Sequence, residues 1–547
     1  MKRLFAVLCV AAALGLAASS ASYAKGAPLV NAPAGTLKGE SEGALNVFEG
    51  IPYAQPPVGP LRWKPPMPLP RWDGIKTTTA YGPGCFQLQS KKLVSIYSED
   101  PMPVSEDCLT LNIWAPADAH NAPVFFWIYG GALWGGASRE ALYDGAPLAQ
   151  HGMIVVTINY RLGVLGWLAH PELSAESPLG ISGNYGLLDQ IAALHWVKDN
   201  IAAFGGDPAN VTIAGESAGG LSVMYLMASP LARGLFAKAI AESAYMVSTP
   251  ELKQARYGSP SAEESGVQLA AALHAPNIAA LRAMDPATLT AGAAAARFAP
   301  FGVVDGHVLT GQLVDIFDKG EQADVPILAG FNSGEIRSLR MLAPPVPPSA
   351  ADYEKVIRAR YGDLADEFLK LYPSTDMQES IWATTRDALY GWTAERLVRK
   401  QTALGQPSFL YFFDHGYPAA DAAGLHGFHA SELPFVFGAT DRTAPLWPKI
   451  PATAQETKLS DAMMEYWSSF ARTGHPEAAG EPAWQAFDST SAYLDFTDAP
   501  HPSQHLLPGM YTLHEQAVCR RKAAGDLAWN WNVGLVSPPL PPHAGCE

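Results

Sequence analysis

A serine between two glycines carries the strongest chemical signal in the chain. Gly215-Glu216-Ser217-Ala218-Gly219 fits the pattern G-x-S-x-G, which in the right context is a tight strand-to-helix turn that exposes a nucleophilic serine. The apolar residues 211–214 before it predict a strand, and residues 218–227 after it predict a helix. The same letters also fit a glycine-rich turn whose serine only caps a helix. The flanking strand and helix favour the nucleophile, beside the positive end of the helix.

A nucleophilic serine needs a histidine that accepts its proton and a carboxylate that orients the histidine. In a strand–serine–helix arrangement the chain order is serine, acid, histidine. We therefore expect His429 to be the base, with His426 as the alternative. The acid is expected after a late strand, where Glu335 follows the predicted strand 325–329. Asp324 lies at the other end of that strand and would face the wrong edge of the sheet.

Acyl transfer also needs N–H donors for the negative charge that develops on the carbonyl oxygen. Gly131 and Ala132 follow the predicted strand 124–128, and their small side chains would let the main chain approach a substrate. We expect their N–H groups, together with that of Ala218, to form an oxyanion hole. Alone, the segment would indicate only a glycine-rich turn.

A metal site is the rival interpretation of the late histidines. Asp414, His415, His426 and His429 could surround a zinc ion, but the sequence has no H-E-x-x-H and no C-x-x-C. It also has no P-loop and no dinucleotide-binding glycine fingerprint. We expect neither a metal nor a cofactor.

These residues require an α/β scaffold that brings distant segments together. Apolar runs predict strands at residues 109–114, 124–129, 153–159, 211–214, 237–241, 325–329 and 409–413. Helical patterns cover residues 185–203 and 218–227, and longer helical stretches cover 261–283 and 353–400. Continuously apolar strands favour a central, mostly parallel sheet flanked by helices. The long helical stretches are expected to roof a pocket at the carboxyl edge of the sheet.

The first residues predict export. Lys2 and Arg3 precede an apolar run over residues 4–18 and small residues up to Ala24, the layout of a signal peptide. We expect cleavage after Ala24, with the mature chain in the periplasm or secreted. Residues 25–535 are expected to form one domain, and the proline-rich residues 536–547 a loosely attached tail.

Charge and cysteine content restrict the partners and the compartment. The formal net charge is −15 and falls to −17 without Lys2 and Arg3, which disfavours nucleic acids and anionic membranes as partners. No later stretch predicts a membrane span. Of five cysteines, the four beyond the signal peptide could close two loops, and structural disulfides are expected in an oxidising compartment. They are Cys85 and Cys108, and Cys519 and Cys546.

Several longer motifs make the chain resemble the type-B carboxylesterase/cholinesterase family over nearly all of the mature sequence. The motifs are residues 48–57 (FEGIPYAQPP), 61–63 (LRW), 105–109 (SEDCL), 159–163 (NYRLG), 184–190 (NYGLLDQ) and 204–208 (FGGDP). The resemblance implies an α/β-hydrolase fold with large helical insertions over the active site. It also implies cleavage of small carboxylic esters through an acyl-enzyme, without a cofactor.

The resemblance further implies roles for individual residues. Ser217, Glu335 and His429 occupy the triad positions, and Gly131, Ala132 and Ala218 those of the oxyanion hole. Cys85 and Cys108 match the family's loop disulfide, and Ser243 matches a serine that supports the acid.

Some features depart from the family or leave alternatives open. The segment between Cys85 and Cys108 has no tryptophan, so specificity for choline esters is not implied. Leu133 and Trp134 are expected to line the pocket, with core packing as the alternative. A non-enzymatic adhesion protein on the same fold, and hydrolysis of amides or thioesters, remain alternatives to an esterase.

Overall fold

The computed structural model describes residues 27–89, 92–525, 527–528, 533–543 and 545–546. The predicted signal peptide, residues 1–24, lies outside the described residues. No helix among the described residues is both long and apolar enough to cross a membrane.

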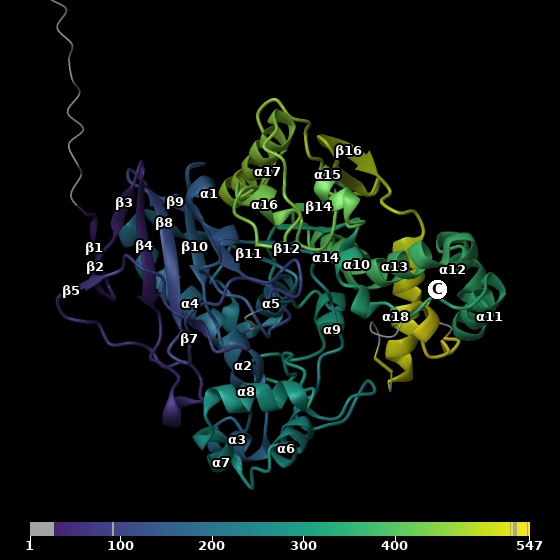
Figure 1. Ribbon diagram of the computed structural model, residues 1–547, viewed down its shortest axis with the longest axis horizontal. Helices are drawn as coiled ribbons and strands as arrows, with labels where there is room; N and C mark the ends of the chain where they lie inside the picture. Colours follow the sequence, from purple (N-terminus) through teal and green to yellow (C-terminus); the bar gives the residue numbers. More distant parts are fainter. Residues whose placement is uncertain (1–26, 90–91, 526, 529–532, 544, 547) are drawn as a thin grey trace, which may run out of the picture.

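One large sheet organises the molecule (Figure 1). Its eleven strands follow the order β16-β15-β14-β13-β12-β11-β9-β10-β8-β4-β3. The bounds are β3 (Glu40–Glu42), β4 (Leu45–Pro52), β8 (Thr110–Pro116), β9 (Ala122–Ile128), β10 (Ile154–Ile158), β11 (Gly206–Glu216), β12 (Lys238–Glu242), β13 (Ile327–Asn332), β14 (Ser408–Phe413), β15 (Ala492–Phe496) and β16 (Pro500–Gln504). The seven adjacent strands β15-β14-β13-β12-β11-β9-β10 run parallel to one another. The outer pairs are antiparallel.

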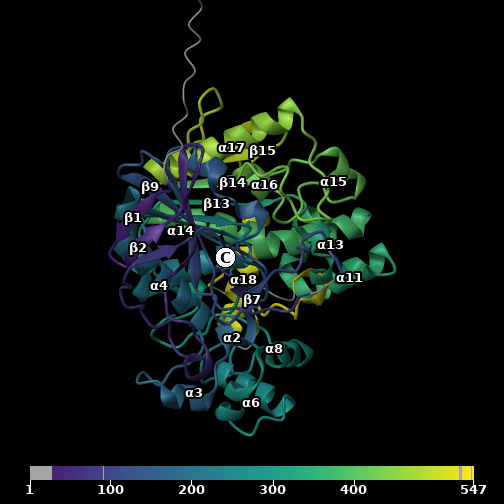
Figure 2. The ribbon, with the colours of Figure 1, turned by 60° about the vertical axis from the view of Figure 1, so that its left-hand side comes forward.

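The parallel strands are buried on both faces, as their continuous apolar sequences predict. Every residue of β9, β10, β12, β13 and β14 is buried. Helices flank the sheet (Figure 2): α5 (Ala218–Ala228) packs against β11 and β12, α14 (Trp392–Ala403) against β13 and β14, and α17 (Ala454–Thr473) against β9 and β11. The predicted mostly parallel sheet flanked by helices is therefore confirmed.

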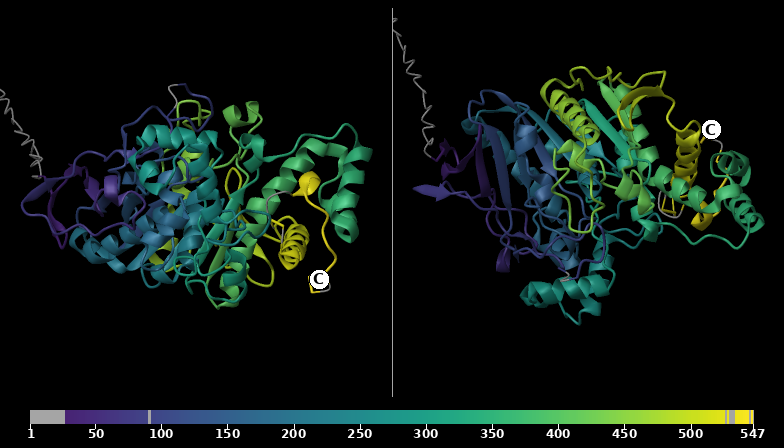
Figure 3. Two further views of the ribbon diagram at one scale, coloured as in Figure 1. Left: turned by 90° about the horizontal axis from the view of Figure 1, so that it is seen from below. Right: turned by 45° about the horizontal axis from the view of Figure 1, so that its top comes forward.

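The predicted helical stretches are broken into shorter helices. The first comprises α6 (Ala262–Ala272) and α7 (Ile278–Ala283), which lie with α8 (Pro286–Ala295) at one end of the molecule (Figure 3). The second comprises α11 (Ala350–Tyr361), α12 (Ala365–Leu371), α13 (Met377–Arg386), a π-helical turn (Asp387–Gly391) and α14. Gly362, with φ of 57°, ends α11, because left-handed φ is where helices commonly stop.

The carboxyl-terminal tail is tied to the body of the protein rather than loosely attached. Leu540 is buried among Tyr353 and Phe368, and its N–H donates to Arg360 O at 2.8 Å. Cys546 is disulfide-bonded to Cys519 in α18 (Met510–Ala524). Proline in the tail does not prevent attachment, because one apolar anchor and one covalent bond are enough to hold it.

Candidate active site

Ser217 lies at the junction of β11 and α5, as predicted. Its main chain has φ of 57° and ψ of −118°, a strained conformation for a residue with a side chain. The Ser217 N–H donates to Glu242 O at 3.0 Å. A Cβ atom on Gly219 would lie 2.0 Å from Ile128 O. The second glycine of the motif is therefore needed for close packing of the turn on β9.

Glu335 and His429 form a buried pair. Glu335 is the first residue of α10 (Glu335–Ser338), directly beyond β13, and its Oε2 contacts His429 Nδ1. Its Oε1 accepts hydrogen bonds from Ser243 Oγ at 2.7 Å and from Asn332 N at 2.8 Å. Three groups from separate segments therefore contact one carboxylate and fix its orientation.

His426 has a different environment from His429. It lies at the surface between two carboxylates, with Nδ1 2.7 Å from Asp421 and Nε2 3.2 Å from Asp414. The hydrogen bond with Asp414, followed by that with Asp421, raises the pKa of His426 to about 9. A histidine that stays protonated is a poor general base at neutral pH.

The histidines and aspartate that suggested a zinc site do not share one centre. His415 Nε2 lies 2.8 Å from Glu456 Oε2, whereas His426 contacts Asp414 and Asp421, and His429 contacts Glu335. No group of three His, Cys, Asp or Glu side chains in the described part of the chain is arranged to hold a metal ion.

The free nitrogen of His429 faces Glu216 rather than Ser217. Nε2 lies 3.0 Å from Glu216 Oε1, and the hydrogen bonds of the described residues include none from the Ser217 hydroxyl. Burial, followed by the charges of Glu335 and Glu242, raises the pKa of Glu216 well above its usual value. Glu216, Ser217 and His429 all border one cavity.

The segment after β9 turns sharply beside Ser217. Gly131 has φ of 90° and Ala132 has φ of 56°, and Gly131 O accepts from Trp134 N at 3.0 Å. Within the described residues, no main-chain hydrogen bond uses the N–H of Gly131 or Ala132, and both residues border the cavity. Ala218 is the first residue of α5, where the helix leaves its N–H groups free.

The prediction that Leu133 and Trp134 line the pocket is wrong. Leu133 is completely buried in the main core, and Trp134 packs edge-to-face on Phe298, with ring centroids 6.3 Å apart. Neither borders the cavity. The reason is the turn itself: Leu133, like Ala132, has a positive φ, of 60°, which turns its side chain into the core.

The cavity has a volume of about 640 Å³, within the range that accommodates small organic ligands. Its lining combines polar and apolar side chains. Apart from the segments around Ser217 and Gly131, the lining includes Gln87, Tyr97, Glu99, Asp100, Glu140, Tyr143, Tyr245, Leu339, Met341, Tyr390, His429 and Trp447. From the two long helical stretches, only Tyr390 contributes to the described lining.

Two tyrosines beside His429 were not predicted. The ring of Tyr390, in the π-helical turn, lies 5.3 Å from the His429 ring. The Tyr97 hydroxyl donates to His429 O at 2.8 Å. Sequence spacing gives no signal for either contact, because both partners come from distant segments. A π-helical turn often marks a functional site, but it is visible only in the structure.

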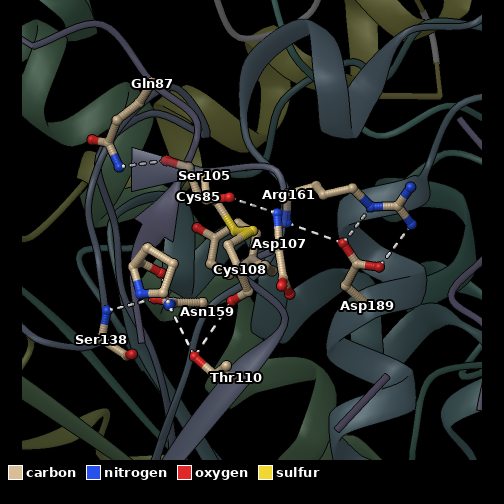
Figure 4. Close-up of a disulfide and its surroundings, with 12 residues drawn as sticks. Cys85, Gln87, Ser105, Asp107, Cys108, Thr110, Ser138, Asn159, Arg161 and Asp189 are labelled. Carbon is tan, nitrogen blue, oxygen red and sulfur yellow. Dashed lines mark hydrogen bonds and ion pairs between the residues drawn. A yellow bond between two sulfur atoms is a disulfide. The ribbon is translucent and has the colours of Figure 1, made fainter. Parts of the chain in front are cut away.

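Cys85 and Cys108 are joined by a disulfide at the base of the segment that lines one side of the cavity (Figure 4). Cys85 ends β6 (Gly84–Cys85), which pairs with β7 (Val104–Ser105). Gln87, just beyond the bond, donates to Gly136 O at 2.8 Å and accepts from Gly136 N at 3.0 Å. The disulfide-closed segment is thus attached to the turn that follows β9.

Comparison with known proteins places this geometry in a family. A model of the carboxylesterase family matches residues 26–511. The chain belongs to the carboxylesterase family. It is 36% identical over 472 residues to fumonisin B1 esterase of Sphingopyxis macrogoltabida, covering 83% of this chain and 84% of that protein. It is also 36% identical over 479 residues to para-nitrobenzyl esterase of Bacillus subtilis, covering 85% of this chain and 94% of that protein.

Solved structures agree with this assignment. A structure of PNB esterase superposes with a TM-score of 0.77 at 33% identity, covering 89% of this chain and 99% of that one. A carboxylesterase of Geobacillus stearothermophilus gives a TM-score of 0.74 at 31% identity, with coverage of 89% and 99%. The fold is therefore the α/β-hydrolase fold, and this member of the carboxylesterase family is a carboxylic ester hydrolase.

Proposed function

We propose that this carboxylesterase is a serine hydrolase that cleaves small-molecule esters with Ser217 as nucleophile, His429 as base and Glu335 as acid. The observation that carries the proposal is the buried Glu335–His429 pair bordering the same cavity as a serine held at φ of 57°. A nucleophile, a base and an orienting carboxylate are the parts that acyl transfer requires.

The first chemical step forms an acyl-enzyme. Ser217 Oγ attacks the ester carbonyl carbon, His429 Nε2 takes the hydroxyl proton, and the same proton then passes to the departing alcohol. For this step Nε2 must exchange its contact with Glu216 for one with Ser217 Oγ. Glu216 and Ser217 are consecutive residues, and both border the cavity together with His429. Water activated by His429 then releases the acid in the second step.

The remaining groups stabilise the charges of this reaction. The free N–H groups of Gly131 and Ala132, with that of Ala218, are proposed to bind the oxyanion. Ser243 Oγ, 2.7 Å from Glu335 Oε1, would hold the carboxylate in the orientation that His429 needs. No step of this mechanism uses a metal or a cofactor.

The size and lining of the cavity support esters of moderate bulk. About 640 Å³ exceeds the volume of a simple acetate. Leu339, Met341 and Trp447 offer apolar contacts, whereas the carboxyl groups of Glu99 and Glu140 offer polar contacts. Neutral esters with both apolar and polar parts would fit this lining better than polyanions.

We also propose that the protein is exported. The motivating observations are the predicted signal peptide and the two disulfides, since such bonds persist in oxidising compartments. Amino-terminal sequencing of protein recovered from outside the cytoplasm should begin at Lys25. Recovery of an uncleaved chain in the cytoplasm would contradict this.

Substitution of the proposed triad tests the mechanism. Ser217→Ala and His429→Gln are each expected to lower kcat for p-nitrophenyl acetate by about 10³-fold or more, whereas His426→Gln, the matched control, should keep kcat within about twofold. Wild-type activity in Ser217→Ala would contradict the proposal. An organophosphonate should label Ser217, and absence of an adduct would instead favour a non-enzymatic protein on this fold.

A further inference from the structure

The segment between the disulfide-bonded cysteines, residues 86–107, reaches the active site at two places, and we call it the disulfide loop. At one end Gln87 is hydrogen-bonded to Gly136 in both directions, at 2.8 and 3.0 Å. In its middle, Tyr97 contacts the segment that carries the base. The disulfide itself lies at the pairing of β6 with β7, because Cys85 is the last residue of β6 and is paired with Ser105 of β7.

Tyr97 joins the acid and base segments through one oxygen atom. Its hydroxyl donates to the main-chain O of His429 at 2.8 Å and also lies 2.7 Å from Ser338 Oγ. Ser338 ends α10, the short helix that begins with Glu335. The contact therefore spans the two segments whose side chains meet in the Glu335–His429 pair.

The ring of Tyr97 is held in place independently of its hydroxyl. It packs edge-to-face against Trp447, with ring centroids 5.8 Å apart and an interplanar angle of 80°. This contact with a neighbouring ring restricts the tyrosine rotamer. The packing of the ring thus does not require the hydroxyl. The effect of the packing and the effect of the hydrogen bond to His429 O can therefore be separated experimentally.

We propose that Tyr97 is a positioning residue, through which the disulfide loop holds the main chain of His429 in register with Glu335. The inference rests on the proposed function. It gives Tyr97 a part in keeping His429 Nδ1 on the Glu335 carboxylate and His429 Nε2 available to Ser217. A displacement of about 1 Å in such a pair lowers the rate by up to about 10²-fold. Tyr97 acts through His429 and does not itself exchange protons with the substrate.

Tyr97→Phe tests the proposal, because it removes only the hydroxyl and keeps the packing on Trp447. We expect kcat to fall by about tenfold, the equivalent of one hydrogen bond, with KM within about twofold. The rate constant for labelling of Ser217 by an organophosphonate should fall by the same factor. A role in stability alone would leave both rate constants unchanged in the folded protein.

Tyr353→Phe is the matched control. Its hydroxyl also donates to a main-chain oxygen, that of Tyr372 at 3.0 Å, but Tyr353 does not border the cavity. Tyr353→Phe should lower the melting temperature by about as much as Tyr97→Phe does, but without changing kcat. Equal kcat values for wild type, Tyr97→Phe and Tyr353→Phe would overturn the proposal, whereas labelling of Ser217 in all three would leave the proposed function intact.

Removing the disulfide tests whether the loop acts through Tyr97. Cys85→Ser/Cys108→Ser should lower kcat in the wild-type background but have less effect once Tyr97→Phe is present, because the contact is already lost. If the fold-reductions in kcat caused by removing the disulfide and by Tyr97→Phe simply multiply in the combined variant, the link between the disulfide and His429 is overturned. Where the double serine variant does not fold, the comparison of Tyr97→Phe with Tyr353→Phe decides the proposal.

Discussion

The main chain beside the nucleophile leaves little choice of side chain. Gly131 has φ of 90°, and a Cβ atom there would lie 2.3 Å from Gly135 O. Ala132 also has a positive φ, of 56°. The N–H groups of both residues make no main-chain hydrogen bond in the described part of the chain, and both residues border the cavity, which supports their proposed role as donors.

Gly131→Ala should disrupt the proposed oxyanion hole. The added methyl group must displace the main chain at Gly135, so we expect kcat to fall by about 10²-fold, as when one oxyanion donor is lost. Steady-state kinetics with p-nitrophenyl esters measure this. Gly43→Ala is the control, because Gly43 also has a positive φ, of 59°, but has no atom within 4 Å of a new Cβ. Unchanged kcat in Gly131→Ala would exclude its N–H as a donor.

Among the elements, the π-helical turn between α13 and α14 has the most direct effect on the site. The wider turn, Asp387–Gly391, brings the buried Tyr390 ring to 5.3 Å from His429, with an interplanar angle of 39°. Tyr390 also packs edge-to-face on Tyr245 at 6.1 Å. An aromatic face near an imidazole stabilises the protonated form that acyl transfer produces.

Replacing the Tyr390 ring by an aliphatic side chain should weaken that stabilisation. We expect Tyr390→Leu to lower kcat by about threefold to tenfold, whereas Tyr390→Phe, which keeps the ring, should stay near wild type. Steady-state kinetics of both variants with p-nitrophenyl esters measure the effect. An equal loss of kcat in Tyr390→Leu and Tyr390→Phe would indicate that the hydroxyl, and not the ring, is responsible.

Seven of the eleven strands of the large sheet could be predicted, because each is a short, mostly apolar run. The other four (β3, β4, β15 and β16) were not predicted, and β3 and β16 have no apolar run to reveal them. The predicted strand 325–329 corresponds to Ile327–Asn332, so only the ends were misplaced. The nucleophile turn was equally local, since two glycines and one serine encode it within five residues. Such features depend on neighbours in the chain, which a sequence displays directly.

The missed contacts depend on tertiary packing. Tyr97 and His429 are 332 residues apart, and no pattern around either one indicates the other. Leu133 lies in the main core and Trp134 packs on Phe298, and these contacts are with segments distant in the sequence. Position next to an oxyanion loop was therefore a poor guide to which side chains face the cavity.

At the scale of the whole molecule, buried carboxylates make stability depend on pH. Glu242 lies at the end of β12, where Trp467 Nε1 donates to its Oε1 at 2.6 Å. Burial raises the pKa of Glu242 from 4.5 to about 8. The folded protein thus keeps a proton that the unfolded chain releases above pH 4.5. The contribution of Glu242 to stability therefore falls as the pH rises from 4.5 to about 8.

Glu242→Gln should remove this part of the pH dependence, because an amide keeps an acceptor for Trp467 and cannot ionise. We expect the melting temperature of the variant to exceed that of wild type by a margin that grows from about pH 5 to about pH 8. Calorimetry at several pH values measures the margin. Glu367→Gln, an exposed substitution on α12, is the control. Its melting temperature should change with pH as that of wild type does. A constant margin for Glu242→Gln would contradict the assignment.

The outermost strands of the large sheet have a consequence for how copies of this protein can associate. β3 is three residues long, fully exposed and carries Glu40 and Glu42. At the opposite margin, β16 contains Pro500 and Pro502, which have no N–H to offer an incoming strand. Short length, like charges and proline all block the addition of a foreign strand. The two margins of the large sheet are thus poor sites for pairing with a strand from another copy of the chain.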